Sequence, residues 1–439
     1  MIFLLTDIIV ILLSFILALS FRFGGFVEVV QHQHSTLAFL LGTTILLSYF
    51  NNLYERYVYV LKVKLFFKII KLWLSVFLVY LITAFFTKYS FLFDSRASII
   101  LYHLFLLIFL LIFKLLIVPR LLGIRYRKDT RKIPCRFIGS SKYLDSIKGF
   151  FKENSLLGFR LHNNPGDKAE DGEPREYFLY SEATDFEKLY REVKKFIVAG
   201  KPLHVASKLF NTLNLNWEWG YFEGIPIYTF RLKNNGVVRN SCRRCLDIIG
   251  ALISIIILAP LFIIIALAIK LDSRGPIIYT QKRCGVDGKE FVMYKFRSMI
   301  DSRDKERDRE LICRRYLEQE VNKEKLIDKK EITFVGSILR RTSLDELPQF
   351  INILKSDMSL VGPRPPLLYE VKYYKDWHRD RLLVKPGLTG LWQVYGRGTM
   401  PCDLSIFLDL IYVINRSLSL DLKMILRTIP VVILGKGAY

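Results

Sequence analysis

Residues 245–269 read CLDIIGALISIIILAPLFIIIALAI and are apolar over almost their whole length. At about 1.5 Å per residue, a helix of this length can cross the hydrocarbon core of a bilayer. Pro260 lies in the middle, where it removes a backbone hydrogen bond and clashes with the preceding turn. The stretch therefore predicts either a proline-kinked helix that crosses a membrane or a helix that breaks at Ala259-Pro260 and returns.

Basic residues flank this run on both sides, with Arg239, Arg243 and Arg244 before it and Lys270 and Arg274 after it. Lys and Arg are favoured on the cytoplasmic side of a membrane. A crossing helix would carry one basic flank, and everything that follows, to the outside, whereas a returning helix keeps both flanks in the cytoplasm. The residue pattern alone leaves both arrangements open.

Four further apolar runs, residues 2–21, 37–50, 65–86 and 99–118, crowd the N-terminal part of the chain. Each predicts a transmembrane helix, although the second is short for one. The segments after the second and fourth runs are the richer in Lys and Arg, so both termini are expected to face the cytoplasm. Asp7 lies within the first run, and it is either a functional group or, as is commoner near a helix end, an interfacial residue.

The chain is strongly basic, with 64 Lys and Arg against 41 Asp and Glu, a net charge of +23. Such an excess favours anionic partners. Together with the apolar runs, it points to membrane phospholipids and phosphorylated small molecules and not to nucleic acid. Of the six cysteines only Cys242 and Cys245 have CxxC spacing, and no second pair completes a zinc site. We expect reduced thiols in a protein facing the cytosol.

Residues 126–236 have no long apolar run and predict a small α/β domain. The strand candidates are residues 134–139, 177–180, 203–206 and 225–230. A Rossmann-like arrangement fits, but the turn after the first strand lacks the repeated glycines that let a backbone approach a pyrophosphate. The domain is therefore expected to be structural or regulatory and not to bind a dinucleotide.

Residues 340–349, RRTSLDELPQ, place two carboxylates after two arginines. Ser343 and Glu346 have capping-box spacing, but a helix starting there would bring the ring of Pro348 against a backbone carbonyl. A helix with Asp345 as its N-cap tolerates the proline and leaves Glu346 without a structural role. A helix end and two arginines would favour ionised carboxylates, which suit a nucleophile or a metal ligand. Capping and catalysis explain the pair about equally well.

Several basic residues lie in rigid or glycine-rich turns. In SLVGPRPP, Pro363 and Pro365 bracket Arg364, and a guanidinium fixed in this way suits bidentate contact with phosphate. The stretch KPGLTGLWQVYGRG contributes Lys385 and Arg397, which are consistent with a phosphate-lined cleft. Solvated turn residues are the alternative, and it is favoured for Lys385.

The C-terminal half resembles a known family through residues 246–285, YKFRSM, RRTSLDELPQFINILKSDMSLVGPRP and VKPGLTGLWQVYGRG. These stretches are similar to the bacterial sugar transferases of the monotopic phosphoglycosyl transferase type, which initiate capsule, exopolysaccharide and O-antigen (lipopolysaccharide) synthesis. The resemblance covers most of residues 240–439. The preceding helices and middle domain are similar to the long form of the family, whose members typically use UDP-glucose or UDP-galactose. One departure is Ser356, which replaces a common glycine.

The resemblance implies transfer of a hexose-1-phosphate from a UDP-sugar to undecaprenyl phosphate, with release of UMP and a covalent phosphosugar-aspartate intermediate. It assigns catalysis to Asp345 and Glu346, with Asp345 as the nucleophile and as a ligand of Mg²⁺, and it makes Pro260 the kink of a re-entrant helix. Phosphoryl transfer needs Mg²⁺ and guanidinium groups to offset the negative charge of the diphosphate. Substrate-binding positions of the family match Lys295, Arg340, Arg364, Arg397 and Asp409.

The expected fold is that of a membrane protein with an N-terminal four-helix transmembrane bundle (residues 1–125) and a middle α/β Rossmann-like domain without catalytic function (126–236). A C-terminal α/β catalytic domain (237–439) follows, with a re-entrant membrane helix at 246–269 and interfacial helices. We expect a multi-pass protein of the bacterial inner membrane whose catalytic domain faces the cytoplasm. The sequence leaves open the sugar, the pathway, homo-oligomer formation and the role of the middle domain.

Two other functions compete with this one. A membrane-tethered NAD-dependent nucleotide-sugar epimerase or dehydratase would need a glycine-rich loop and a Tyr-x-x-x-Lys pair. Tyr190 and Lys194 have that spacing, but the loop is missing. A non-catalytic scaffold that binds polyprenyl lipid would need neither the carboxylates nor their arginines.

Overall fold

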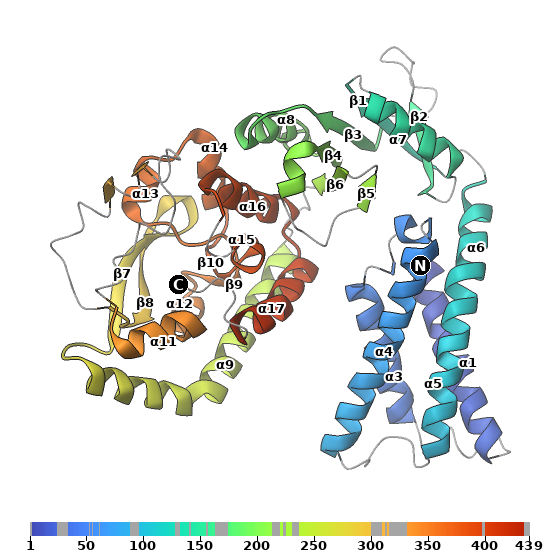
Figure 1. The fold of residues 1–439 in the computed structure, drawn as a ribbon, viewed down its shortest axis with the longest axis horizontal. Helices are drawn as coiled ribbons and strands as arrows, with labels where there is room; N and C mark the ends of the chain where they lie inside the picture. Colours follow the sequence, from blue (N-terminus) through green and yellow to red (C-terminus); the bar gives the residue numbers. More distant parts are fainter. Residues whose placement is uncertain are drawn as a thin grey trace. The chain divides into compact units, whose positions relative to one another are not determined.

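The computed structural model describes residues 2–23, 34–51, 53–54, 56–60, 62–87, 96–127, 132–139, 142–154, 157–162, 174–212, 220–222, 225–230, 237–299, 310–311, 314–315, 332–396 and 400–433. The chain forms two compact units, Met1–Phe178 and Leu179–Tyr439. Figure 1 shows their elements, and each unit is considered by itself.

The first unit begins with apolar helices, α1 (Ile2–Phe23), α3 (His34–Phe50), α4 (Lys62–Thr87), α5 (Arg96–Ile112) and α6 (Val118–Arg125). The short 3₁₀ helix η1 (Arg56–Tyr59) precedes α4, and one π-helical turn, η2 (Phe113–Ile117), joins α5 to α6. All four N-terminal apolar runs are therefore helical, as predicted. Within the described residues, three of these helical stretches are long and apolar enough to cross a membrane, and α3 is a shorter apolar helix.

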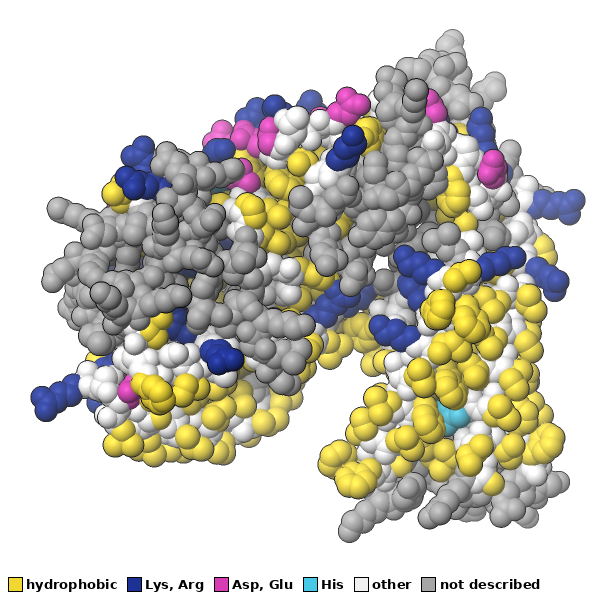
Figure 2. All heavy atoms as spheres, viewed as in Figure 1, with side chains coloured by type: hydrophobic (Ala, Val, Ile, Leu, Met, Phe, Trp, Pro, Cys, Tyr) yellow, Lys and Arg dark blue, Asp and Glu magenta, His cyan; other side chains and the backbone are white. Residues whose placement is uncertain are grey.

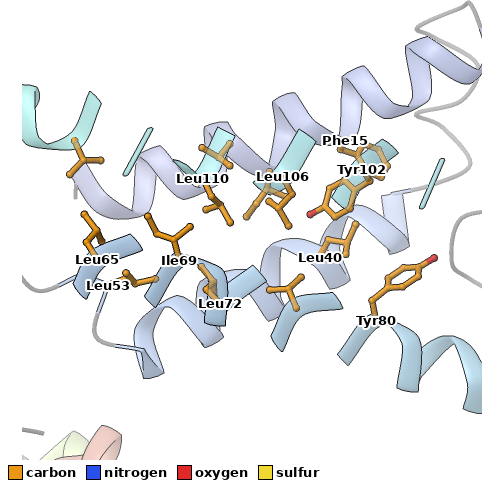
Figure 3. Close-up of a cluster of buried hydrophobic side chains, with 14 of the residues drawn as sticks. Phe15, Leu40, Leu53, Leu65, Ile69, Leu72, Tyr80, Tyr102, Leu106 and Leu110 are labelled. Carbon is orange, nitrogen blue, oxygen red and sulfur yellow. The ribbon is translucent and has the colours of Figure 1, made fainter. Parts of the chain in front are cut away.

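The bundle is held together by an apolar core to which α1, α3, α4 and α5 all contribute. Phe15, Leu40, Leu72 and Leu106 are among its buried side chains, and Figure 3 shows them directed towards one another. The outer faces are also apolar, because Phe85 and its neighbour on α4 are each 78% exposed. Figure 2 shows hydrophobic side chains covering the visible side of the bundle. A surface of this kind is suited to a bilayer and not to water.

Asp7 lies inside the helical bundle. Its side chain is fully buried and lies 2.5 Å from the Lys114 ammonium, which is also fully buried. Lys114 belongs to the π-helical turn η2. π-helical turns commonly redirect a side chain at one point of a helix. An intramembrane acid is tolerated where a basic partner of this kind accompanies it.

The middle part of the chain contains a mixed sheet. Its strands are β1 (Ile133–Ile138), β2 (Phe159–His162), β3 (Glu176–Ser181), β4 (Leu203–Ser207), β5 (Gly220–Phe222) and β6 (Ile225–Phe230). The strand order is β2-β1-β3-β4-β6-β5, with β1 parallel to β2 and β6 antiparallel to both β4 and β5. The four predicted strands are all present, and the sequence missed the short β2 and β5. The helices α7 (Lys142–Glu153) and α8 (Phe186–Val198) and the 3₁₀ helix η5 (Lys208–Thr212) complete this part.

The C-terminal part starts with the long helix α9 (Val237–Asp272) and the hairpin β7 (Ile278–Cys284) and β8 (Glu290–Phe296). Asp287 and Gly288 form its turn with positive φ angles of 52° and 77°, which are typical of an Asp-Gly hairpin turn. There follow α11 (Phe334–Thr342), η10 (Leu344–Glu346), α12 (Gln349–Leu354), β9 (Ser359–Val361), α13 (Leu368–Lys372), α14 (Asp376–Arg379), η11 (Asp380–Leu383), β10 (Gly387–Thr389), α15 (Leu391–Tyr395), α16 (Cys402–Asn415) and α17 (Leu418–Ile433).

Helix α9 contains Pro260 and bends part-way along its length (Figure 1). Before the proline, Ala251 packs with Phe350 and neighbouring core residues, and beyond it Ile265 packs with Phe296 and Leu339. Both halves therefore lie against the same compact unit. The opposite face is apolar and exposed, with Ile256 at 71%. Its other exposed side chains are Ile249, Leu252, Ile253, Ile257, Ile263, Ile264, Leu267 and Leu271. Figure 2 shows hydrophobic side chains along the lower left edge, where Figure 1 has part of α9.

The start of α9 is fixed by polar contacts. The Arg243 guanidinium, only 3% exposed, donates to Asp421 at 2.9 Å, and Arg244 donates to the C-terminal carbonyls of α12. The Asp247 carboxylate accepts bonds from the Ser359 hydroxyl and the Leu360 amide of β9. Arg243 and Arg244 thus join α9 to the rest of the unit and are more than a charged flank.

Strands β9 and β10 approach each other so closely that glycine is required between them. A Cβ on Gly362 would lie 2.4 Å from the Lys385 carbonyl oxygen and 2.7 Å from the Gly387 nitrogen. Backbone atoms cannot move aside as a flexible side chain can. This pair carries the turns that contain Arg364 and Lys385.

We predict that Gly362→Ala lowers the stability of the protein by about 2–4 kcal/mol, through overpacking against backbone. Gly149→Ala in α7 is the matched control, because its Cβ would meet nothing within 4 Å. Thermal unfolding in detergent measures both. Equal unfolding temperatures for the two variants would contradict the close approach.

Candidate active site

The two acids of RRTSLDELPQ lie in a tight turn between two helices. The Thr333 hydroxyl caps α11 by accepting a bond from the Gly336 amide, and the helix ends at Ser343, whose φ of 57° is left-handed. A single 3₁₀ turn, Leu344–Glu346, follows, and α12 starts only at Gln349. Both capping expectations are therefore wrong, since Ser343 makes no capping bond and Asp345 does not begin a helix.

The turn directs Asp345 inwards and Glu346 towards Lys295 of strand β8. Asp345 is 9% exposed, and the Lys295 ammonium donates to the Glu346 carboxylate at 2.7 Å. Leu344 and Leu347, on either side of the acids, pack into the cluster formed by Ile265, Phe296 and Leu339. Apolar packing therefore fixes the backbone that presents the two carboxylates.

The pKa of Asp345 is raised from 3.8 to about 6, chiefly by burial, and the Glu346 carboxylate acts in the same direction. Lys295 and Arg340 lower the pKa, but burial outweighs them. The sequence predicted the opposite direction because it placed this carboxyl at a helix N-terminus, which the structure does not have. Arg340 itself is half-buried, and its guanidinium lies 3.1 Å from the Met299 sulfur.

The loop that carries Arg364 is held by two buried arginines. The Arg381 guanidinium donates to the Arg364 carbonyl at 3.1 Å, and Arg283 of β7 donates to the next carbonyl, of Pro365, at 3.0 Å. The Arg364 side chain is 36% exposed and lies 3.4 Å from Glu370. Burial lowers the pKa of Arg283 to about 10, with Arg364 acting in the same direction. Glu346 favours the charged forms of both Arg283 and Arg364, which links this loop electrostatically to the acids.

Asp409 contacts another side chain of the fold, and its expected role in substrate binding stays a prediction. It is fully buried in α16 and accepts a hydrogen bond from Arg381. Burial raises the pKa of Asp409 to about 6, and the Arg381 guanidinium opposes that rise. Asp409 thus acts through Arg381 on the Arg364 loop. Sequence reasoning missed Arg283 and Arg381, because a buried arginine that binds carbonyls has no local sequence signature.

Lys385 and Arg397 were the other two residues expected to line a phosphate-binding cleft. The Lys385 ammonium donates to the Ser356 hydroxyl at 2.5 Å, so it has a partner within the chain. Ser356 has a φ of 73°, a left-handed backbone conformation that favours glycine. This agrees with the glycine that the family resemblance implies at this position. Arg397 lies outside the described residues.

The C-terminal part of the chain matches a known protein family. The family model for bacterial sugar transferases matches residues 238–435. The exopolysaccharide production protein ExoY of Sinorhizobium fredii is 38% identical over 204 residues, which are 45% of this chain and 88% of that protein. The chain belongs to the bacterial sugar transferase family.

Longer relatives match this chain over about half of their own length. The galactosyl transferase CpsE of Streptococcus agalactiae is 41% identical over 219 residues, 49% of this chain and 48% of the relative. The undecaprenyl-phosphate galactose phosphotransferase of Salmonella typhimurium is 38% identical over 273 residues, 60% of this chain and 56% of the relative.

The acids of the candidate site fit Mg²⁺ together with phosphate oxygens of a substrate. Among the described residues, no group of three or more His, Cys, Asp or Glu side chains could hold a metal ion. Mg²⁺ is commonly held by one or two carboxylates together with phosphate oxygens. Asp345 with the neighbouring Glu346 can supply such a pair, although Glu346 also binds Lys295.

We predict that Asp345→Asn raises the unfolding temperature at about pH 8 by roughly 5 °C, because the substitution removes a buried charge. The native carboxyl holds its proton up to a pKa of about 6, whereas the unfolded chain releases it near 3.8. The wild type therefore loses stability relative to the variant as the pH rises between these values, and the difference should vanish near pH 4. Asp287→Asn, in an exposed turn, is the control. A variant less stable than the wild type at pH 8 would show that ionisation of Asp345 does not cost stability.

Proposed function

We propose that this sugar transferase transfers a hexose-1-phosphate from a UDP-sugar to undecaprenyl phosphate and releases UMP, thereby starting a polysaccharide such as an exopolysaccharide, capsule or O-antigen. The observation that carries the proposal is the buried Asp345 in a turn shared with Glu346, beside Lys295 and electrostatically linked to the Arg364 loop. The names of relatives support the substrate class. One is an undecaprenyl-phosphate galactose phosphotransferase, and a Klebsiella pneumoniae relative, 37% identical over 239 residues, is a UDP-glucose:undecaprenyl-phosphate glucose-1-phosphate transferase. We therefore propose glucose or galactose as the sugar.

In the proposed reaction, a carboxylate oxygen of Asp345 attacks the sugar-linked β-phosphorus. The bond between this phosphorus and the bridging oxygen breaks, and UMP leaves with the bonding electron pair. A phosphate oxygen of undecaprenyl phosphate then attacks the same phosphorus and regenerates the carboxylate. Division into two steps lets a water-soluble donor leave before a lipid acceptor reacts.

Cationic groups must offset the repulsion between the attacking carboxylate and the diphosphate. We assign this work to Lys295, Arg340 and Arg364, with Arg397 as a further candidate. When bound, Mg²⁺ held by Asp345 would neutralise charge on the phosphate oxygens. Glu346 orients Lys295 through the contact of 2.7 Å. Asp409 is proposed as a positioning residue, because its carboxylate is fully buried.

The rival NAD-dependent activity loses support in the structure. Tyr190 and Lys194, which have the spacing of a catalytic pair, both donate to the carboxylate of Asp380. A non-catalytic scaffold remains as the rival, and an activity measurement separates it from the transferase.

We predict that Asp345→Asn reduces UMP release at least 1,000-fold, roughly the loss expected when a covalent nucleophile is removed. The assay contains UDP-glucose or UDP-galactose, Mg²⁺ and undecaprenyl phosphate, and Asp287→Asn is expected to keep wild-type activity. Without acceptor, a donor labelled in its β-phosphate should leave label on the wild-type polypeptide and none on Asp345→Asn. Near-wild-type turnover by Asp345→Asn would end the assignment of the nucleophile, and a wild type that releases no UMP would favour the scaffold.

We further propose that α9 dips into the membrane and returns, leaving the catalytic part in the cytoplasm. The support is the packing of both halves of α9 on one unit, since a spanning helix would have to separate its ends by the bilayer thickness. The bend at Pro260 and the exposed apolar face, which includes Ile256 and Leu267, fit insertion into one leaflet.

We predict that an epitope tag after Tyr439 is cleaved by added protease in sealed inverted inner-membrane vesicles, with no need for detergent. The reason is that a returning α9 keeps the C-terminus on the cytoplasmic side, which faces outwards in such vesicles. A periplasmic protein trapped inside the vesicles serves as the sealing control. A tag cleaved only after permeabilisation would show that α9 spans.

A further inference from the structure

Helix α8, from the middle part of the chain, donates two hydrogen bonds to one carboxylate near the candidate active site. The Tyr190 hydroxyl lies 2.6 Å and the Lys194 ammonium 2.5 Å from the same oxygen of Asp380. Tyr190 is 4% exposed, so its bond to the carboxylate is shielded from water. Hydrogen bonds from buried donors to charged acceptors are among the stronger contacts in proteins.

Aromatic packing extends this contact. Phe186 at the start of α8 lies 4.9 Å, between ring centroids, from Phe407 of α16, and the Tyr190 ring lies 6.1 Å from Trp377 of α14. Lys375 and Glu187 add an ion pair at 3.6 Å in which the lysine is half exposed. Helix α8 is therefore docked on α14 and α16, all within the second compact unit.

The residue after Asp380 faces the candidate active site. The Arg381 guanidinium binds Asp409 and donates to the Arg364 carbonyl at 3.1 Å and to the Tyr374 hydroxyl at 2.8 Å. Adjacent Cα atoms are 3.8 Å apart and joined by a planar peptide, so a displacement of Asp380 also displaces Arg381. One short turn, η11, thus connects the surface that receives α8 with the loop that presents Arg364.

We propose that α8 positions the substrate-binding loop of the transferase: Tyr190 and Lys194 fix Asp380, and through Arg381 they fix the backbone of Arg364. This inference deepens the proposed function and rests on it, because it assumes that Arg364 contacts the phosphates of the donor. It gives the middle part of the chain a role in binding the nucleotide sugar without placing any of its residues at the reacting atoms.

Loss of the contacts between α8 and Asp380 should reduce the activity without abolishing it. The ExoY relative has 88% of its length matched by 45% of this chain, so that protein is only about half as long as this one. A family member of that length has little room for the bundle and the middle sheet. Helix α8 lies outside residues 238–435, which match the family model, so its positioning role is an addition to the part shared by the family.

The test is a double variant of the full-length protein, Tyr190→Phe with Lys194→Met, which removes both donors and keeps the ring and the apolar stem. We expect the KM for the UDP-sugar to rise about fivefold, with kcat changed less than about twofold. The KM for undecaprenyl phosphate should stay at its wild-type value. In an Arg364→Ala background the double variant should raise the KM no further, because the residue through which it acts is already lost.

Lys375→Met is the matched control, since it removes an ion pair between α8 and the residue that precedes α14 without touching Asp380 or Arg381. Lys194→Arg, which keeps a donor, should restore most of the affinity lost in Lys194→Met. A wild-type KM in the double variant would overturn the proposal, and so would a KM increase of the same factor in the Arg364→Ala background.

A measurement that does not depend on activity separates this inference from the proposed function. Hydrogen–deuterium exchange should become faster in the double variant at residues 376–383 and at the amides of Arg364 and Leu367. If the wild type releases no UMP but the exchange increases at both places, the proposed reaction fails and the mechanical connection stands. Unchanged exchange at Arg364 and Leu367 overturns the connection whatever the activity.

Discussion

Burial of the Asp345 carboxylate is the constraint on which the candidate active site depends. A carboxylate that is 9% exposed loses most of its hydration, and Lys295 and Arg340 offset only part of that loss. The turn must therefore be held by other interactions, and it is held by Leu344 and Leu347 in the apolar core. A charge kept at a cost in stability, surrounded by cationic groups, is typical of sites that act on phosphates.

Some arginines hold the fold, as Leu344 and Leu347 do, whereas others are available for chemistry, as Asp345 is. Arg243, Arg283 and Arg381 are buried and hold carbonyls or carboxylates of the fold. Arg364 is half exposed, which leaves its guanidinium able to meet a ligand. The large number of basic residues is thus a poor measure of the substrate's charge. Some of the arginines bind backbone carbonyls in turns, where no helix or sheet supplies the hydrogen bonds.

Hydrophobic pattern predicted the apolar helices and four strands of the sheet. The candidate residues Lys295, Asp345 and Glu346 were found because a family resemblance carries them, and the structure brings them together. The environment of Asp345 was predicted wrongly, since the left-handed Ser343 that ends α11 is not visible in a helical pattern. Arg381 was beyond sequence reasoning because a buried arginine that binds a carbonyl has no local sequence signature. The docking of α8 was beyond it because it depends on a contact between residues 190 positions apart.

The pairing of Asp7 with Lys114 has a consequence for the order in which the bundle is built. The acid is near the start of the first helix, and its partner is in the π-helical turn at the end of the fourth run. During synthesis the first helix must wait for more than a hundred further residues before its carboxylate meets the ammonium. The ion pair that fills the interior of the bundle can therefore form only after the last of these helices has been made.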